Sequence, residues 1–147
     1  MAATAGAYHS AAVGEDGALF LWGEGDWGRL GTGDTATRRA PTRVPRLPAP
    51  ARQVAAGRGH TGIVTDAGDL LMCGIGQDGQ LGLGVDADRT TPTLVERALF
   101  DDDAVLMVAC GGAHTAALTE GGGVYTFGHG GDGRLGHRDE EDQLAPR

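Results

Sequence analysis

Short apolar runs alternate with glycine-rich turns along the whole chain. In the first part, residues 8–13 and 18–22 form two such runs, which are joined by the turn residues Glu15-Asp16-Gly17. The same pair of runs returns twice, at 60–65 with 70–73 and at 114–119 with 123–127. The runs are too short for helices and are bounded by glycine, and no stretch keeps a helical period. Each pair therefore predicts a β-hairpin, and the chain as a whole an all-β fold.

The second strand of each predicted hairpin is apolar on both faces. In the first hairpin, Phe20 and Trp22 alternate with Leu19 and Leu21, and the later hairpins follow the same pattern. Such a strand must be covered from both sides. The first strands carry small residues at matching positions, namely Ala11, Gly62 and Ala116. This combination favours sheets that pack closely side by side in a radial array.

A glycine-rich motif follows each hairpin and divides the chain into repeats. It reads Gly23-Glu24-Gly25-Asp26-Trp27-Gly28-Arg29-Leu30-Gly31 in the first copy, and the later copies begin at Gly74 and Gly128, 51 and then 54 residues on. A period of this size indicates one supersecondary unit used repeatedly. We assign repeat one to residues 6–56, repeat two to 57–110 and a truncated repeat three to 111–147, all in one array over residues 1–147.

Two further extended segments separate the hairpins. They are 42–47 with 52–56, and 93–97 with 104–109. Each repeat thus offers about four strands, as in a propeller blade, and we predict a partial β-propeller of about three four-stranded blades. The chain begins just before one hairpin and ends where the other repeats start another strand. We therefore expect a piece of a longer ring, or self-association through open blade edges.

Composition and charge narrow the classes of function. The 27 glycines are periodic, which argues against disorder, and the net charge of −8 disfavours nucleic-acid binding. The segment between Asp34 and Asp66 holds six arginines and no acid, which fits either a solvated loop or a docking patch for an acidic partner. Two isolated cysteines, no leader-like N-terminus and no apolar run of spanning length indicate an intracellular protein of cytoplasm or nucleus, with no membrane contact.

The motifs that resemble active sites have structural explanations. The G-x-G-x-x-G pattern at Gly23 is followed by Leu-Gly rather than a helix, so it lacks the context of a dinucleotide site. His9, His60 and His114 begin equivalent strands of different blades, where we expect a hydrogen bond within each blade rather than a shared metal. No nucleophile stands beside a base. We predict no catalytic residue, cofactor or metal, and hence no enzyme.

Trp27 is the most informative departure from the repeat. It stands where the other copies have Asp78 and Asp132. An exposed indole is typical of protein interfaces, although Trp27 packing over its own blade is the alternative. The predicted partner-binding surface comprises Trp27 and six further loop residues, namely Asp26, Arg29, Asp78, Gln80, Asp132 and Arg134.

The combined pattern resembles the regulator of chromosome condensation repeat. It comprises Gly-x-x-His-Ser/Thr, a hairpin, Trp/Cys/Phe-Gly, then Gly-Gln/Arg-Leu-Gly and a downstream proline, and it covers nearly the whole chain in three copies. The resemblance implies a β-propeller, seven-bladed in the family, and a protein partner. Family members include exchange factors for a small nuclear GTPase, domains of ubiquitin ligases and a plant ultraviolet receptor. The receptor relies on a tryptophan cluster, whereas this chain has only Trp22 and Trp27.

We therefore expect a repeat module for protein–protein interaction. The resemblance implies regulation of a small GTPase as a guanine nucleotide exchange factor. The alternative is an interaction scaffold or substrate-recognition fragment of a ubiquitin-ligase-like protein.

Overall fold

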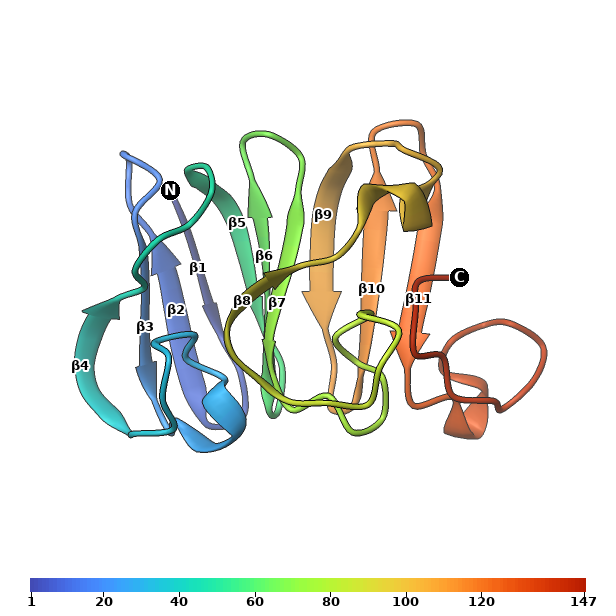
Figure 1. Cartoon of the computed structure of the whole chain (residues 1–147), viewed down its shortest axis with the longest axis horizontal. Helices are drawn as coiled ribbons and strands as arrows, with labels where there is room; N and C mark the ends of the chain where they lie inside the picture. Colours follow the sequence, from blue (N-terminus) through green and yellow to red (C-terminus); the bar gives the residue numbers. More distant parts are fainter.

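Three antiparallel β-sheets stand side by side in the computed structural model, which describes all residues from Met1 to Arg147 (Figure 1). No α-helix is present, and no helix is long and apolar enough to cross a membrane. The strands are β1 (Ala2–Ala5), β2 (His9–Val13), β3 (Leu19–Gly23), β4 (Arg38–Arg43), β5 (Ala51–Ala56), β6 (His60–Thr65), β7 (Leu70–Gly74), β8 (Arg89–Leu94), β9 (Val105–Cys110), β10 (His114–Thr119) and β11 (Val124–Gly128). Three short 3₁₀ turns are η1 (Asp26–Gly28), η2 (Arg97–Phe100) and η3 (Gly131–Gly133).

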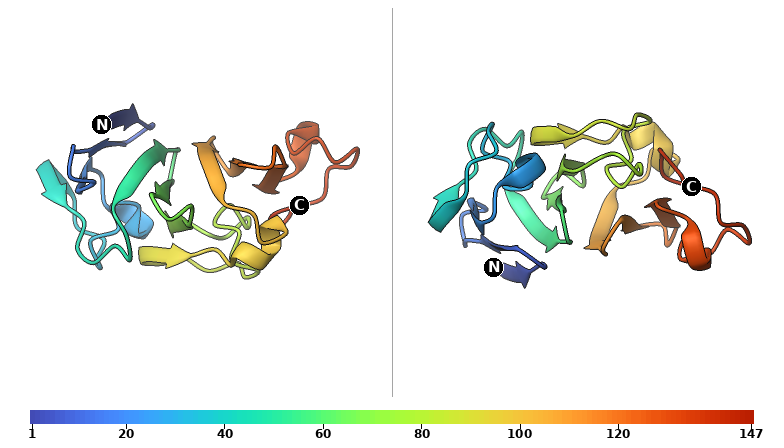
Figure 2. Two further views of the ribbon diagram at one scale, coloured as in Figure 1. Left: turned by 90° about the horizontal axis from the view of Figure 1, so that it is seen from above. Right: turned by 90° about the horizontal axis from the view of Figure 1, so that it is seen from below.

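Each sheet is a meander of consecutive strands. The orders are β1-β2-β3-β4, β5-β6-β7-β8 and β9-β10-β11, and in the third sheet a single bridge between Gly128 and Gln143 stands in the place of a fourth strand. Seen end-on, β1 and β9 lie toward one side of the molecule and β8 toward the other (Figure 2). The all-β prediction is confirmed, with sheets of four, four and three strands.

The sheets and the sequence repeats are staggered by one strand. β5 closes the first repeat in sequence but is the first strand of the second sheet, and β9 has the same relation to the third sheet. β1 opens the first sheet, and the sequence pattern did not indicate it as a strand. The outer strands β4 and β8 begin about four residues before the expected 42–47 and 93–97. Both are polar edge strands that contain a proline, so they carry little apolar pattern.

The core lies between the sheets rather than within any one of them. Ala11, Val13, Leu19 and Leu21 of the first sheet bury against residues of the second that include Ile63, and an equivalent cluster joins the second sheet to the third. The small residues allow this approach: a Cβ on Gly62 would come within 2.9 Å of Val108 in the third sheet. The predicted close packing of sheets is therefore present at both junctions.

A hydrogen-bonded relay crosses each junction. Nε2 of His9 in the first sheet lies 2.7 Å from Oγ1 of Thr61 in the second, and Thr61 donates to the carbonyl of Arg29 at 2.6 Å. His60, Thr115 and the carbonyl of Gln80 repeat the arrangement at 2.9 and 2.8 Å. The expected bond within each blade is thus wrong, because the imidazole points away from its own sheet toward the hydroxyl of the next one.

The relay fixes the tautomer of both imidazoles. A threonine hydroxyl has one proton, and here the proton goes to a carbonyl, so the threonine oxygen must accept from an Nε2–H. Burial, followed by the charge of Arg29, lowers the pKa of His9 from 6.5 to about 4. Burial likewise lowers the pKa of His60 to about 4. Both side chains therefore sit in the interior as neutral donors.

We expect the free energy of unfolding to fall as the pH is lowered from 6.5 toward 5. Well above pH 6.5 both imidazoles are neutral in the folded and in the unfolded chain. Between pH 6.5 and about 4 only the unfolded chain takes up these protons. The free energy of unfolding therefore falls by up to about 1.4 kcal/mol per pH unit for each histidine. Urea unfolding at pH 7, 6 and 5 measures this loss.

The double substitution His9→Gln with His60→Gln keeps a side-chain donor and should flatten the dependence. Hydrogen bonds from Arg38 and Thr119 lower the pKa of the Asp34 and Asp103 carboxyls below 3.8, so those groups act at still lower pH. A wild-type chain equally stable at pH 7 and 5 would contradict the buried neutral relay.

Candidate functional site

The three glycine-rich loops gather at one end of the molecule, opposite the hairpin turns (Figure 1). Each loop leaves its hairpin through a glycine at positive φ, for example Gly23 at 113°. A Cβ on Gly23 would come 2.5 Å from the Tyr8 carbonyl oxygen, so only glycine permits this exit. The loops thereby start at equivalent places, and their non-repeated side chains form one end surface, the glycine-loop end.

Arg29 is the buried centre of the first loop. Its side chain is 1% exposed and lies 3.0 Å from the Glu24 carboxylate. It also donates to the carbonyls of Asp26 and Arg58, each at 3.1 Å, and Arg58 belongs to the connection leading into the second hairpin. A buried cation needs such a set of acceptors to offset its lost hydration. Arg29 therefore ties the first loop to the second sheet.

Two aromatic rings cover this cation. The guanidinium carbon of Arg29 lies 4.8 Å from the ring centre of Trp27 and 5.5 Å from that of Tyr8. Trp27 remains 39% exposed and Tyr8 53% exposed. Trp27 is held at φ 60°, a conformation that bulky side chains rarely adopt, and its ring also lies over Gly59 beside the second sheet. The indole thus packs across the junction and keeps part of its surface open to solvent.

The structure corrects the expected rim of this surface. Arg29 and Gln80 occupy the same repeat position and are both buried, because the following sheet covers each of them. Gln80 accepts a hydrogen bond from the Asp78 amide at 2.9 Å. Neither residue can form an exposed rim.

The third member of this repeat position differs. Arg134 is 32% exposed, pairs with the exposed Asp132 at 3.0 Å and donates to the Gly131 carbonyl at 2.7 Å. Asp26 is also exposed, while Asp78 is half-buried. The exposed members of the predicted set are therefore Trp27, Asp26, Asp132 and Arg134. Tyr8 was missed, although it is an aromatic residue where the other repeats have Gly59 and Ala113.

The arginine-rich segment lies largely at the opposite end or along the outer edge. A hollow of about 700 Å³ lies between residues 16–19 and residues 43–50 of this segment. Arg38 pairs with Asp34 at 2.7 Å, and Arg52 donates to the Val105 carbonyl of the third sheet at 3.0 Å. These two arginines serve internal contacts.

No reactive constellation accompanies the surface. No group of three or more His, Cys, Asp or Glu side chains is arranged to hold a metal ion. Burial raises the pKa of the Cys73 and Cys110 thiols to about 12, so neither is a thiolate near neutral pH. The arrangement offers shape, aromatic surface and charge.

We expect Arg29→Ala and Arg134→Ala to differ sharply, although the two residues share a repeat position. Loss of Arg29 leaves two carbonyls without this donor and removes the support under both rings, which should cost about 2–4 kcal/mol of unfolding free energy. Arg134 is exposed, and its loss should cost about 0.5 kcal/mol or less. Chemical denaturation measures both values, and similar costs would show that exposure does not separate them.

The segments that match known proteins correspond to the three sequence repeats. The profile of the regulator of chromosome condensation (RCC1) repeat matches residues 16–64 and 67–118, and a second RCC1 repeat profile matches residues 108–134. The chain is 38% identical over 144 residues to the probable E3 ubiquitin-protein ligase HERC4 of Homo sapiens, covering 97% of this chain and 13% of that protein. It is 40% identical over 139 residues to the ultraviolet-B receptor UVR8 of Arabidopsis thaliana, covering 94% and 31%.

The structure of Prp20p from Saccharomyces cerevisiae superimposes on this chain with a TM-score of 0.86 at 25% identity, covering 99% of this chain and 37% of Prp20p. The chain thus spans well under half the length of each of these proteins. The RCC1 repeat profiles, which match residues 16–64, 67–118 and 108–134, show that the chain belongs to the RCC1 repeat family, and the superposition on Prp20p agrees with this.

Proposed function

We propose that the chain is a protein-binding module that recognises its partner through the glycine-loop end, as an interaction or substrate-recognition region of a ligase-like protein. The observation that carries the proposal is Trp27, which is held at φ 60° over a buried cation while 39% of it faces solvent. Backbone strain of this kind costs about 1–3 kcal/mol and concentrates at functional sites.

The geometry suits binding because it is already ordered. Arg29 is fixed by Glu24 and two carbonyls, so the rings of Trp27 and Tyr8 rest on a rigid base. Ordered aromatic anchors lose little conformational entropy on association and are common among interface hot spots. The exposed carboxylate of Asp26 and the partly exposed one of Glu24 give the anchor a polar rim.

The substitution Trp27→Gly tests the role of the indole in binding separately from its role in stability. Glycine adopts φ 60° without strain, so we expect the unfolding free energy to stay within about 1 kcal/mol of wild type and partner affinity to fall at least about tenfold. Asp132→Gly is the matched control, since Asp132 also sits at φ 60° in the third loop.

Quantitative affinity purification with both variants provides the readout. Proteins retained by Asp132→Gly and lost by Trp27→Gly support the proposal, and purified candidates then give dissociation constants. Identical sets of bound proteins for the two variants would argue against it.

Nucleotide exchange on a small GTPase is the second candidate. The support is the similarity to Prp20p, a protein described by its binding to Gsp1p and histones. An exchange factor acts by binding the nucleotide-free partner more tightly than the nucleotide-bound one. That mechanism also needs only a surface, so it is compatible with the absence of a reactive group here.

Release of a fluorescent GDP analogue from purified Gsp1p distinguishes the two candidates. As an interaction region of a ligase-like protein, the chain should leave the release rate within about twofold of the spontaneous rate. Acceleration of about tenfold or more, lost in Trp27→Gly, would instead establish exchange. Prp20p serves as the positive control.

A further inference from the structure

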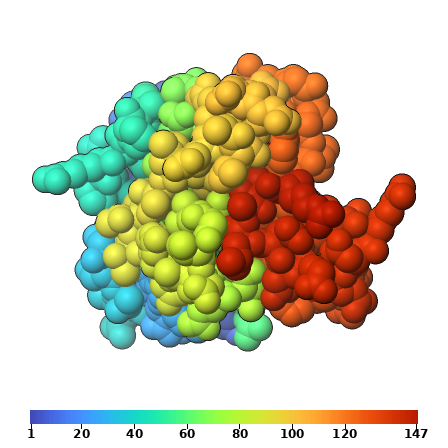
Figure 3. Space-filling view, turned by 45° about the vertical axis from the view of Figure 1, so that its right-hand side comes forward, coloured from blue at the N-terminus to red at the C-terminus, as the bar shows by residue number.

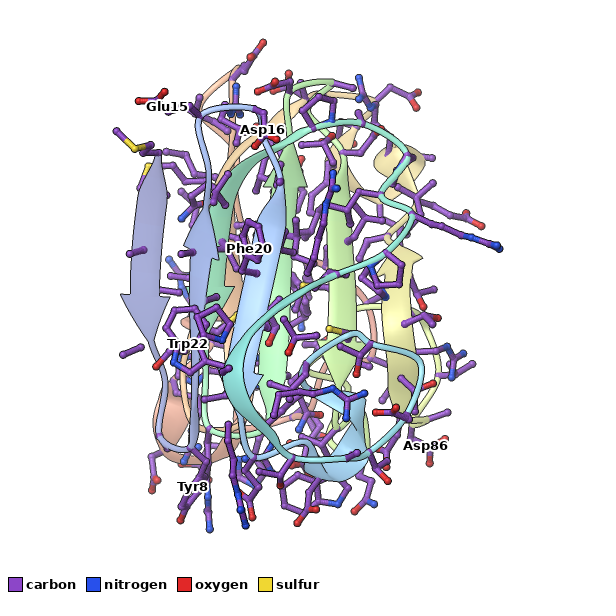
Figure 4. The ribbon with its side chains drawn as sticks, turned by 90° about the vertical axis from the view of Figure 1, so that its left-hand side faces the viewer. Tyr8, Glu15, Asp16, Phe20, Trp22 and Asp86 are labelled. Atoms are coloured by element: carbon purple, nitrogen blue, oxygen red, sulfur yellow. The ribbon has the colours of Figure 1, made fainter.

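The two outer sheets each leave one face without a neighbouring sheet. On the third sheet this face carries Met107, Ala109, Ala116, Leu118 and Val124, which line a wholly apolar depression. Met107 is 53% exposed and Val124 is 69% exposed. The first sheet shows its open face in Figure 4, where Phe20 and Trp22 lie across it.

These faces are the two halves of a junction that the molecule already contains twice. Leu118 and Val124 correspond in the repeat to Val64 and Leu70, which the second sheet buries against the third. Phe20 corresponds to Leu71, which the second sheet buries against the first. Each open face therefore carries apolar residues at positions that are buried in the second sheet.

The polar relay is also half-formed at both ends. His9 and His60 each bond to the hydroxyl of the next sheet, whereas His114, their equivalent on the open face of the third sheet, has no such partner. The equivalent of Thr61 and Thr115 on the open face of the first sheet is Ser10. The carbonyl that would take the Ser10 proton is that of Arg134, the counterpart of Arg29 and Gln80.

Backbone hydrogen bonds across the junctions follow the same series. Ala7 donates to the Gly57 carbonyl and Arg58 to the Gly111 carbonyl, both at 3.2 Å. At the equivalent positions, the amide of Gly112 in the third repeat has no acceptor in a following sheet, and the carbonyl of Gly6 in the first repeat has no donor from a preceding sheet.

A second backbone series lies along the glycine loops. The Gly33 amide donates to the Thr90 carbonyl at 2.9 Å, and the Gly84 amide donates to the Leu144 carbonyl at 2.8 Å. By the repeat spacing, the equivalent donor in the third repeat is the Arg138 amide, and the equivalent acceptor in the first repeat is the Arg39 carbonyl. Figure 3 shows the C-terminal segment that contains Leu144 seated against the second repeat.

Two glycines of the third loop lack the close neighbours that their equivalents have in the first two loops. A Cβ on Gly79 would lie 2.7 Å from Leu144, and one on Gly82 would lie 2.7 Å from Phe127, whereas a Cβ on their equivalents Gly133 and Gly136 would meet no atom within 4 Å. Glycines that face a neighbouring sheet in the first two repeats face open space in the third.

We propose that the open face of the third sheet binds the open face of the first sheet of a second copy, in a head-to-tail contact that repeats the internal junctions. His114 of one copy would donate to the Ser10 hydroxyl of the other copy, and that hydroxyl would donate to the Arg134 carbonyl of the first copy. Phe20 of the other copy would cover the apolar depression. The occupant must present a hydroxyl to His114, a backbone carbonyl to the Gly112 amide and apolar side chains to the depression. The first repeat of the chain itself has these groups in Ser10, Gly6 and Phe20.

A heterologous contact of this kind is tested by blocking one face at a time. Ala12→Asp places a charge on the open face of the first sheet, and Val124→Asp places one on that of the third. Val85→Asp, in an exposed loop, is the matched control. Sedimentation velocity at about 100 μM, well above a Kd of about 1 μM, gives the masses, and circular dichroism checks the fold.

We expect the wild type and Val85→Asp to have at least twice the mass of one chain, and each face variant alone to be monomeric. An equimolar mixture of the two face variants should form a dimer and stop there, since it retains one intact pair of faces. A monomeric wild type, a face variant that still associates, or a mixture that stays monomeric would each overturn the proposal. His114→Ala should weaken the mixed dimer at least about tenfold, because Ser10 would lose its donor.

Discussion

Every sheet of this chain is apolar on both faces, and this constraint governs the rest of the structure. Leu19 and Leu21 point to one neighbour while Phe20 and Trp22 point to the other side, so a single sheet cannot hide its own apolar surface. Burial of one large apolar side chain contributes about 1.5–3 kcal/mol, and the gain is realised only when another sheet lies alongside. Stability therefore resides in the junctions, as in other repeat proteins.

Apolar contact alone would not fix how the sheets are aligned. It is non-directional, and small residues such as Ala11 and Gly62 would let neighbouring sheets slide. The imidazole, hydroxyl and carbonyl of each relay meet at 2.6 to 2.9 Å only in one alignment. The relay reaches from the start of a hairpin strand to the loop that ends the same hairpin, so it also sets where each glycine loop lies. The need to bury the apolar faces between sheets thus also fixes the position of the glycine-loop end.

The sequence predicted the inner parts of this fold far better than its edges. Hairpin strands such as His60–Thr65 have apolar runs between glycines, and the repeat places their copies in register. β1 and β4 have no such runs, since a strand at a sheet edge can be polar or made of small residues. The stagger between repeat and sheet was also invisible, because a periodic sequence looks the same wherever its unit is cut.

The surface was less predictable because exposure depends on the neighbour rather than on the repeat. Arg29 and Arg134 share a motif position, yet only Arg29 has a following sheet to cover it, and no local pattern distinguishes the two. Departures from the repeat were the useful signal. Trp27 replaces an aspartate and Tyr8 replaces a small residue, and the fold brings both rings onto one guanidinium.

Two such replacements over one guanidinium suggest that different positions of the repeat serve different roles. Positions that face a neighbouring sheet are constrained by the junction and recur as histidine, hydroxyl, glycine and leucine. Positions at the loop tips have no such constraint, and their identity can vary without loss of the fold. Trp27 is unfavourable for its own backbone conformation, at φ 60°, and its contacts with Arg29 and Gly59 still leave 39% of the residue exposed. The partner contact proposed above would account for this exposed indole, because rigid aromatic side chains are frequent among interface hot spots.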